Sequence, residues 1–324
     1  MKIKSIKIEN FRAIQSLSVK ATLSDGMLLF GGRNGSGKTS ALEAIMWALG
    51  NGLREQPRGP LPKQNCLVEL FVDNLNGQEC TVKATRNASI VEVSQNADGQ
   101  EASHRRDRTI LNSISGFYFS SWRTPKRVGP VGLTLGKKGK RPQQKDFNAL
   151  WNLKQSLINF KGAVGFRSGV WREDRVTEMF ERLNRAWSRF YPDGQEQFHA
   201  EICNPEASDS HNPSSDEELG FDVFLSRQSV ESPIPIDDLS SGEIELLCFI
   251  GTILLEEYRR NRPFDFVFLD EPELHLNRAW HRLLIPVLRE ISPQTQYFIA
   301  THSEDVWNSV YEEQRVLLKG GRRA

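Results

Sequence analysis

The segment GRNGSGKT, at residues 32–39, contains the residue types that bind a phosphate chain. It fits the spacing GxxxxGK[ST] at every position. Glycines let backbone N–H groups turn inward around phosphates, and a following helix N-terminus adds partial positive charge. Lys38 would reach the β- and γ-phosphates, and the Thr39 hydroxyl would coordinate Mg²⁺. The residues expected around a nucleotide are Gly32, Arg33, Asn34, Gly35, Ser36, Gly37, Lys38, Thr39 and Ser40.

Two acidic residues follow an apolar segment later in the chain. Asp270 and Glu271 come directly after FVFL, which predicts a buried strand. A parallel strand delivers such residues to the ligand edge of an open sheet. Asp270 would hold Mg²⁺ there, and Glu271 would polarise the attacking water as a general base. A solvated acidic turn is the alternative, and it would be favoured if the phosphate-loop motif were absent.

Two histidines are candidates for the same edge. His302 follows YFIAT, another predicted buried strand, which would bring its ring beside the γ-phosphate to sense phosphate or to orient water. A structural hydrogen-bonding role is the alternative. His275, in ELHLN, is equally consistent with capping a helix.

The segment LSSGE, at 239–243, allows two interpretations. Ser240 followed by Glu243 ahead of an apolar run predicts a helix capping box. The same helix N-terminus could instead bind a phosphate, because its first backbone N–H groups have no partner within the helix. The residues of this segment alone leave both interpretations open.

Apolar periodicity predicts the elements that position these residues. Alternating residues over 3–11 indicate a strand, GMLLF indicates a short buried strand before the phosphate loop, and a helix is predicted from Thr39. Further strands are predicted at CLVELFV, SIVEVSQ, GFYFSSWR and RVLLKG, and helices at VTEMFERLNRAWSRFY and over 280–291, with a kink at Pro286. Strands alternating with helices imply an α/β sheet that is at least partly parallel.

Changes in composition divide the chain into three segments. Residues 1–119 are predicted to form the N-terminal part of the core, and residues 236–324 to complete it. The middle segment, 120–235, would hold a helical lobe between a basic loop at 123–145 and an acidic, Pro/Ser-rich loop. The basic loop could bind nucleic acid or an acidic partner, or be solvated without a partner. Its basic residues are Arg123, Lys126, Arg127, Lys137, Lys138, Lys140, Arg141 and Lys145.

Bulk composition excludes several classes of protein. At 324 residues the chain is long enough for one large domain or two lobes. It has no apolar window of membrane-spanning length and does not start like a signal peptide, so we expect no membrane partner and a cytoplasmic location. The four cysteines form no CxxC pair, so neither a zinc site nor a disulfide framework is expected. Because the net charge is only +1, any attraction to nucleic acid must come from local patches.

These motifs, in this order, resemble those of an ATP-binding-cassette (ABC) ATPase. GRNGSGKT is similar to the Walker A motif, LSSGE to the signature motif, FVFLDE to the Walker B motif and ATHS to the switch-histidine region. The resemblance implies an α/β P-loop NTPase fold with a mixed sheet core and a smaller helical lobe. It implies ATP and Mg²⁺ as ligands, with Thr39 and Asp270 at the metal and Glu271 and His302 in hydrolysis.

The resemblance also implies that the signature motif acts in trans. In this family the signature helix of one subunit points at ATP held by another subunit. A homodimer or larger homo-oligomer joined by ATP sandwiches would follow. Ser241 stands where the family usually has glycine. The residues that would contact the partner's nucleotide are Ser240, Ser241, Gly242 and Glu243.

NGSGKTSALEAI and LDEPELHL resemble the chromosome-maintenance, RecF and OLD (overcoming lysogenisation defect) branch of the family more than transporter subunits. Without sustained heptads, long coiled-coil arms are not expected, and the segment after His302 is too short for the nuclease domain of full OLD-type proteins. Such compact ATPases resemble components of bacterial antiphage systems, such as AriA of the PARIS system and the Septu ATPase. This resemblance implies slow hydrolysis, ATP-dependent assembly, and control of a separate effector, a nuclease or toxin, during phage infection.

Three other functions stay open. A RecF-like DNA-binding ATPase would act in DNA repair. A non-hydrolysing, ATP-gated scaffold would bind ATP and assemble, although Glu271 argues against complete inactivity. A transporter subunit is disfavoured, because Gln64 is a poor candidate for a glutamine-loop residue. The ending KGGRRA leaves open whether the chain is part of a longer protein.

Overall fold

The chain forms two compact units, of which unit 1 contains Met1–Trp122, Pro263–Leu274 and Pro293–Ala324 and unit 2 contains Arg123–Arg262 and His275–Ser292. The three segments expected from the sequence are continuous, whereas each of these units is built from separate parts of the chain. The helix that follows LSSGE belongs to unit 2, together with most of the middle segment. The computed structural model describes residues 1–20, 26–50, 65–73, 79–86, 88–93, 114–121, 128, 131, 149–165, 173–192, 194, 196–203, 220–228 and 230–319.

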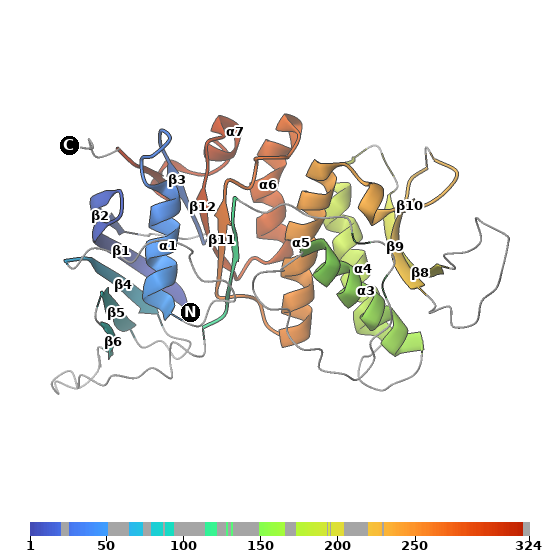
Figure 1. Ribbon diagram of the computed structural model, residues 1–324, viewed down its shortest axis with the longest axis horizontal. Helices are drawn as coiled ribbons and strands as arrows, with labels where there is room; N and C mark the ends of the chain where they lie inside the picture. Colours follow the sequence, from blue (N-terminus) through green and yellow to red (C-terminus); the bar gives the residue numbers. More distant parts are fainter. Residues whose placement is uncertain are drawn as a thin grey trace. The chain divides into compact units, whose positions relative to one another are not determined.

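A parallel five-stranded sheet forms the centre of unit 1 (Figure 1). All of its strand pairs are parallel, so the carboxyl ends of the strands share one edge. The three middle strands are buried along their whole length, which explains their unbroken apolar sequences. In spatial order the strands are β13 (Arg315–Leu317), β3 (Met27–Gly31), β12 (Gln296–Ala300), β11 (Phe266–Asp270) and β7 (Gly116–Phe119).

An antiparallel sheet forms the second layer of unit 1. Its strands β4 and β5 bury every second residue, as expected of strands with one face on a core. The mixed strand directions that the sequence predicts are thus distributed over two separate sheets. In spatial order the strands are β2 (Ile14–Lys20), β1 (Lys2–Phe11), β4 (Leu67–Asp73), β5 (Glu79–Thr85) and β6 (Ala88–Val93).

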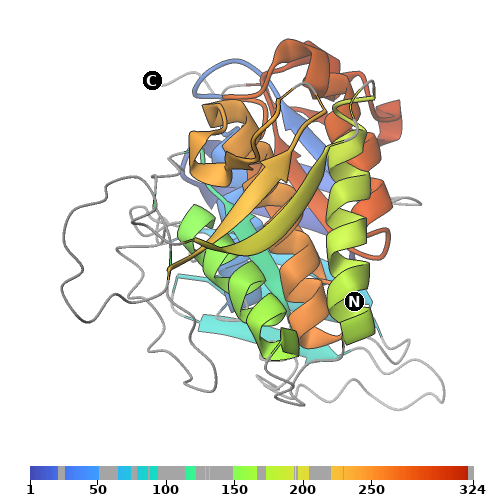
Figure 2. The ribbon, with the colours of Figure 1, turned by 90° about the vertical axis from the view of Figure 1, so that its right-hand side faces the viewer.

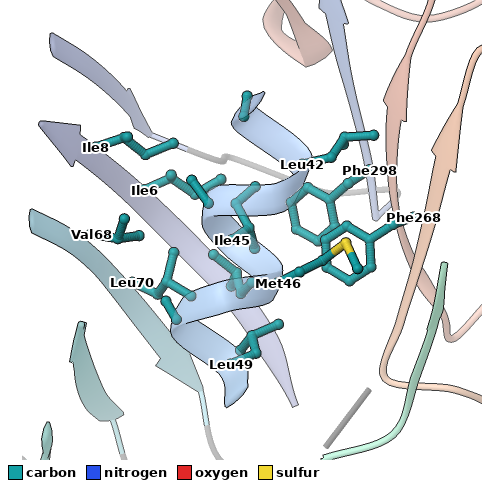
Figure 3. Close-up of a cluster of buried hydrophobic side chains, with 14 of the residues drawn as sticks. Ile6, Ile8, Leu42, Ile45, Met46, Leu49, Val68, Leu70, Phe268 and Phe298 are labelled. Atoms are coloured by element: carbon teal, nitrogen blue, oxygen red, sulfur yellow. The ribbon is translucent and has the colours of Figure 1, made fainter. Parts of the chain in front are cut away.

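Helix α1 (Lys38–Leu49) is buried between these two sheets. In Figure 3 the side chains of Ile45 and Met46 lie between apolar residues of the antiparallel sheet and the rings of Phe268 and Phe298. Those two rings stack at 5.1 Å between centroids, on neighbouring strands of the parallel sheet. Because α1 is apolar on both sides, most of its residues are buried. Unit 1 also contains α7 (Glu304–Trp307) and η4 (Glu312–Gln314).

Unit 2 combines helices with a small antiparallel sheet, and Figure 2 shows β8 and β9 crossing α3 and α4. Helices α3 and α5 approach so closely that a Cβ atom on Gly251 would lie 2.5 Å from Leu153. The helices are α3 (Ala149–Gly165), α4 (Glu173–Ser188), α5 (Ser241–Arg260) and α6 (Arg278–Ile291). The other elements are β8 (Gln197–Cys203), β9 (Gly220–Ser226), β10 (Ile234–Pro235) and η3 (Ile236–Asp238).

The strands and helices predicted from periodicity are present, and α6 continues through Pro286. The structure adds elements that were not predicted, namely β2, β5, β8, β9, β10, α7, η3 and η4, and α3 lies in the segment expected to form a helical lobe. Cys66, Cys80 and Cys248 are buried free thiols. Across the part of the chain that the structure describes, the helices are too short or too polar to cross a membrane. The eight basic residues of the 123–145 loop lie outside the described residues.

Candidate functional site

The glycine-rich loop connects β3 to α1 in unit 1. Gly32, at φ 142°, leaves no room for a side chain, because a Cβ atom there would lie 2.6 Å from the carbonyl oxygen of Leu318. Gly37, at φ 103°, directly precedes α1 and takes a left-handed conformation that favours glycine. The buried hydroxyl of Ser36 has no hydrogen-bond partner among the described residues. A phosphate oxygen entering the loop would supply one.

Lys38 begins α1 and its side chain is only 5% exposed. Its ammonium group donates hydrogen bonds to the carbonyl oxygens of Gly32 (3.1 Å) and Arg33 (3.2 Å). Burial lowers the pKa of Lys38, and the nearby carboxylates of Glu271, Asp270 and Glu273 oppose this shift. A buried cation among carboxylates, held by loop carbonyls, is suited to bind a polyanion.

Asp270, the last residue of β11, is 1% exposed and accepts hydrogen bonds from hydroxyl groups of unit 1. The Thr39 hydroxyl on α1 lies 3.0 Å from its Oδ1 atom. The hydroxyls of Ser121 and Tyr118, which come from β7 and the residues after it, lie 3.1 Å and 3.5 Å from its Oδ2 atom. Hydroxyl and carboxylate oxygens are ligands that Mg²⁺ prefers, so Thr39 and Asp270 fit this ion.

Glu271 and His302 face each other at the same edge. His302 Nε2 lies 3.3 Å from Glu271 Oε1, and both side chains are partly exposed. Glu271 has a left-handed backbone, with φ 48°, and its N–H group donates to the carbonyl oxygen of Ala300 at 2.8 Å. The end of β11 is therefore fastened to the end of β12. A carboxylate and an imidazole paired in this way can orient and deprotonate water.

The turn between β1 and β2 lies against the phosphate loop. A Cβ atom on Gly37 would come within 3.1 Å of Ile14 and 3.6 Å of Ala13. Arg12, in this turn, pairs with Glu43 of α1, and burial lowers the pKa of its guanidinium. Arg12 could not be recognised from the sequence, because a lone arginine after a strand has no motif. The structure places it next to the phosphate loop.

The LSSGE segment caps α5 in unit 2. Ser240 Oγ accepts from the Glu243 N–H group at 3.4 Å, and Glu243 Oε2 accepts from the Ser240 N–H group at 2.8 Å. The predicted capping box is thus confirmed. Gly242 packs against the main chain of His275, because a Cβ atom there would lie 2.5 Å from its carbonyl oxygen. Only glycine fits at this position.

A network of polar side chains contacts Glu243 of the capping box. Glu243 Oε1 accepts hydrogen bonds from the Tyr191 hydroxyl and the Arg227 guanidinium, and Arg227 also pairs with Glu196 at 3.1 Å. Burial alone would raise the pKa of Glu243, but hydrogen bonds from Tyr191, Ser240 and Arg227 outweigh it and hold that pKa below its ordinary value. Burial, and then the bond to Glu243, raise the pKa of Tyr191. Glu243 therefore stays ionised at neutral pH.

The structure brings together Lys38, Thr39, Asp270, Glu271 and His302 within unit 1. Arg33, Asn34 and Gly35 are exposed at the tip of the loop. Asn277 caps the N-terminus of α6 through its side chain, the role considered for His275. Ser121 was missed, although it lies within the predicted strand GFYFSSWR, because a serine has no motif of its own there.

A family model described as "RecF/RecN/SMC N terminal domain" matches residues 2–322. The Septu protein PtuA of Bacillus thuringiensis is 24% identical over 317 residues, which cover 93% of this chain and 72% of that protein. The "Retron Ec83 probable ATPase" of Escherichia coli is 30% identical over 111 residues, which cover 32% of this chain and 20% of that protein. The match to a second PtuA, from Bacillus mycoides, spans 38% of that protein.

Two solved structures share the fold. A crystal structure of the SmcHead bound to the C-winged helix domain of ScpA has a TM-score of 0.55 and 16% identity, and covers 96% of this chain and 92% of its own. The second is an Smc head domain with an extended coiled coil, bound to the C-terminal domain of ScpA derived from Pyrococcus furiosus. It has a TM-score of 0.53 and 15% identity, and the match covers 95% of this chain and 92% of that chain. At these identities the likeness concerns the fold alone.

Proposed function

Since this chain belongs to the RecF/RecN/SMC N-terminal domain family of ABC-type ATPases, we propose that its loop 32–40 binds ATP with Mg²⁺ and that Glu271 drives slow hydrolysis. Lys38 and the backbone N–H groups of the loop would hold the phosphates. Mg²⁺, held by Thr39 and Asp270, would neutralise charge on the β- and γ-phosphates. Glu271 would orient and polarise the attacking water, and His302 would hold that carboxylate in place.

One observation supports this proposal most strongly. The Thr39 hydroxyl contacts Asp270 at 3.0 Å, while Glu271, the next residue, lies 3.3 Å from His302. The proposed metal ligands Thr39 and Asp270 and the proposed base Glu271 therefore lie together at the carboxyl edge of one parallel sheet. Such an edge is where open α/β sheets bind their ligands.

The signature residues would complete the site of a second subunit. Ser240, Ser241 and Gly242 form the N-terminus of α5, where backbone N–H groups and the helix dipole favour an anion. Glu243 is engaged in the capping box and in its bonds to Tyr191 and Arg227, so it would shape this terminus without contacting phosphate. We propose a head-to-tail homodimer, or a larger homo-oligomer, with ATP between subunits.

We further propose a role in antiviral defence, in which ATP-driven assembly controls a separate effector such as a nuclease or toxin. The match to PtuA of the Septu system over 93% of this chain and the match to retron ATPases support this role. A RecF-like ATPase that binds DNA through the 123–145 loop in repair is the alternative, and a non-hydrolysing scaffold is another. Purification of the untagged protein distinguishes the defence role from the repair role, because an effector would co-purify in the first case and DNA in the second.

ATP turnover and ATP titration test the ATPase proposal. Glu271→Gln keeps the shape but not the base, so turnover should fall about 10²- to 10⁴-fold while ATP binding persists. Lys38→Ala should weaken ATP binding about tenfold or more, because it removes charge-assisted hydrogen bonds. The exposed Glu313→Gln is the matched control. Absence of turnover in the wild-type protein would favour the scaffold, and wild-type turnover of Glu271→Gln would reject the role of that residue.

Phage challenge tests the defence proposal. Cells that express the chain together with the effector that co-purifies with it should resist phage, and Lys38→Ala should remove that resistance without lowering the amount of protein. Resistance that survives Lys38→Ala would separate the defence role from nucleotide binding.

A further inference from the structure

Glu273 is a buried carboxylate of unit 1 for which the proposed reaction has no use. It lies two residues after Glu271 and is 7% exposed. Its Oε1 atom accepts three hydrogen bonds, from the Thr301 hydroxyl at 2.6 Å and from the N–H groups of His302 at 2.7 Å and Ser303 at 3.0 Å. Its Oε2 atom is buried without a hydrogen-bond partner among the described residues. Because burying a charge is costly, the carboxylate depends on the three donors at Oε1.

These bonds fix the main chain of His302 from one side, and the parallel sheet fixes it from the other. The N–H group of Thr301 donates to Phe30 of β3 at 3.1 Å. The N–H group of Ser303 also reaches the Thr301 hydroxyl at 3.0 Å. The His302 side chain itself is 36% exposed, so its packing restrains it little. The direction of the ring therefore depends largely on the backbone that Glu273 holds.

The same residue belongs to the turn that carries Glu271. The N–H group of Leu274 donates to the Glu271 carbonyl oxygen at 3.1 Å, which closes this turn after β11. Glu273 thus bridges the loop that presents Glu271 and the loop that presents His302. The Glu273 carboxylate and the hydrogen bond from the Glu271 N–H group to the Ala300 carbonyl oxygen both join these two loops, whose side chains Glu271 and His302 lie 3.3 Å apart.

We propose that Glu273 is a positioning residue that holds His302 against Glu271 and that it influences ATP hydrolysis only through His302. This inference rests on the proposed ATPase function. It differs from a direct role of Glu273 at the nucleotide or water, in which the loss of Glu273 would add to the loss of His302. It also differs from a role in folding alone, which would change the melting temperature but not kcat.

A double-mutant cycle on kcat tests the proposal in the full chain, with Glu273→Ala, His302→Ala and the double variant. We expect both single variants to lower kcat by about tenfold or more with little change in KM, and we expect Glu273→Ala to add less than about twofold in the His302→Ala background. Glu304→Ala, an exposed carboxylate two residues from His302, is the control and should keep wild-type kcat. Independent, multiplicative losses would overturn the proposal, and so would wild-type kcat in His302→Ala.

Glu273→Gln keeps the test decisive if Glu273→Ala does not fold. Its amide oxygen can accept the same three hydrogen bonds without the charge, so kcat should lie between those of wild type and His302→Ala. The same cycle applies, and a kcat for Glu273→Gln below that of His302→Ala would contradict the proposal. Absence of ATP turnover in the wild-type protein would reject the ATPase function itself. If Glu271→Gln is inactive and the kcat losses of Glu273→Ala and His302→Ala multiply in the double variant, only the positioning role is rejected.

Discussion

The hydroxyl of Thr39 lies 3.0 Å and 3.1 Å from the two carboxylate oxygens of Asp270, although 231 positions separate these residues in the sequence. The first residue follows the phosphate loop and the second ends a strand of the parallel sheet. Their contact places the two proposed metal ligands side by side.

Thr39→Val should raise the Mg²⁺ concentration needed for half-maximal ATPase activity by about tenfold, because it removes one oxygen ligand and keeps the shape. Thr39→Ser retains the hydroxyl and is the matched control. A magnesium titration of turnover provides the measurement. An unchanged Mg²⁺ requirement in Thr39→Val would remove Thr39 from the metal site.

Ser240→Arg tests whether the cap of α5 also acts on a partner's nucleotide. The arginine would place a bulky cation at the helix N-terminus, where a phosphate should dock, and would leave the phosphate loop intact. ATP binding should survive, while turnover should fall about 10²-fold or more. Ser240→Asp, which keeps a good cap but adds a negative charge, should also lose turnover. Wild-type turnover in both variants would mean that this segment only caps a helix.

Lys154 of α3 makes a buried ion-pair cluster in unit 2, with Asp222 of β9 at 2.6 Å and with Asp237 of η3. Lys154→Met would leave two buried carboxylates without their cation and should destabilise the protein by about 3–5 kcal/mol. Lys161→Met, on an exposed position of the same helix, is the control and should change the stability little. Chemical denaturation monitored by tryptophan fluorescence measures both.

Acid should weaken the cap of α5. The folded-state pKa of Glu243 lies below its ordinary value, so its contribution to stability is complete above that ordinary value and is lost as the pH falls through the folded-state pKa. Glu243→Gln should therefore melt below wild type at about pH 7, and the difference should shrink as the pH falls below the ordinary pKa of a glutamate carboxyl group. A difference that is constant with pH would mean that the charge of Glu243 contributes nothing.

Sequence patterns predicted the parts of the site that are local in the chain. The phosphate loop needs glycines and Lys38 within a few positions, and the capping box needs only Ser240 and Glu243. Both therefore have short signatures. Asp270 and Glu271 were predictable because an apolar strand ended in them.

Contacts between distant segments were not predictable in this way. Ser121 reaches Asp270 only because β7 pairs with β11, and 149 positions separate the two residues. Arg227 and Tyr191 meet Glu243 only after the helices and sheet of unit 2 have packed. Strand β5 was missed although it buries alternate residues, since Cys80 and Ala84 are weak strand signals and charged or polar residues lie between them.

The left-handed backbone at Glu271 implies a trade-off between durability and turnover. A residue with a β-carbon costs about 1 kcal/mol or more in this conformation, and asparagine tolerates it better than glutamate. Glu271→Asn should therefore melt at a higher temperature than wild type and yet hydrolyse no ATP. If so, the backbone at this position favours a residue that cannot act as the base, and a screen for heat resistance alone would discard the active protein.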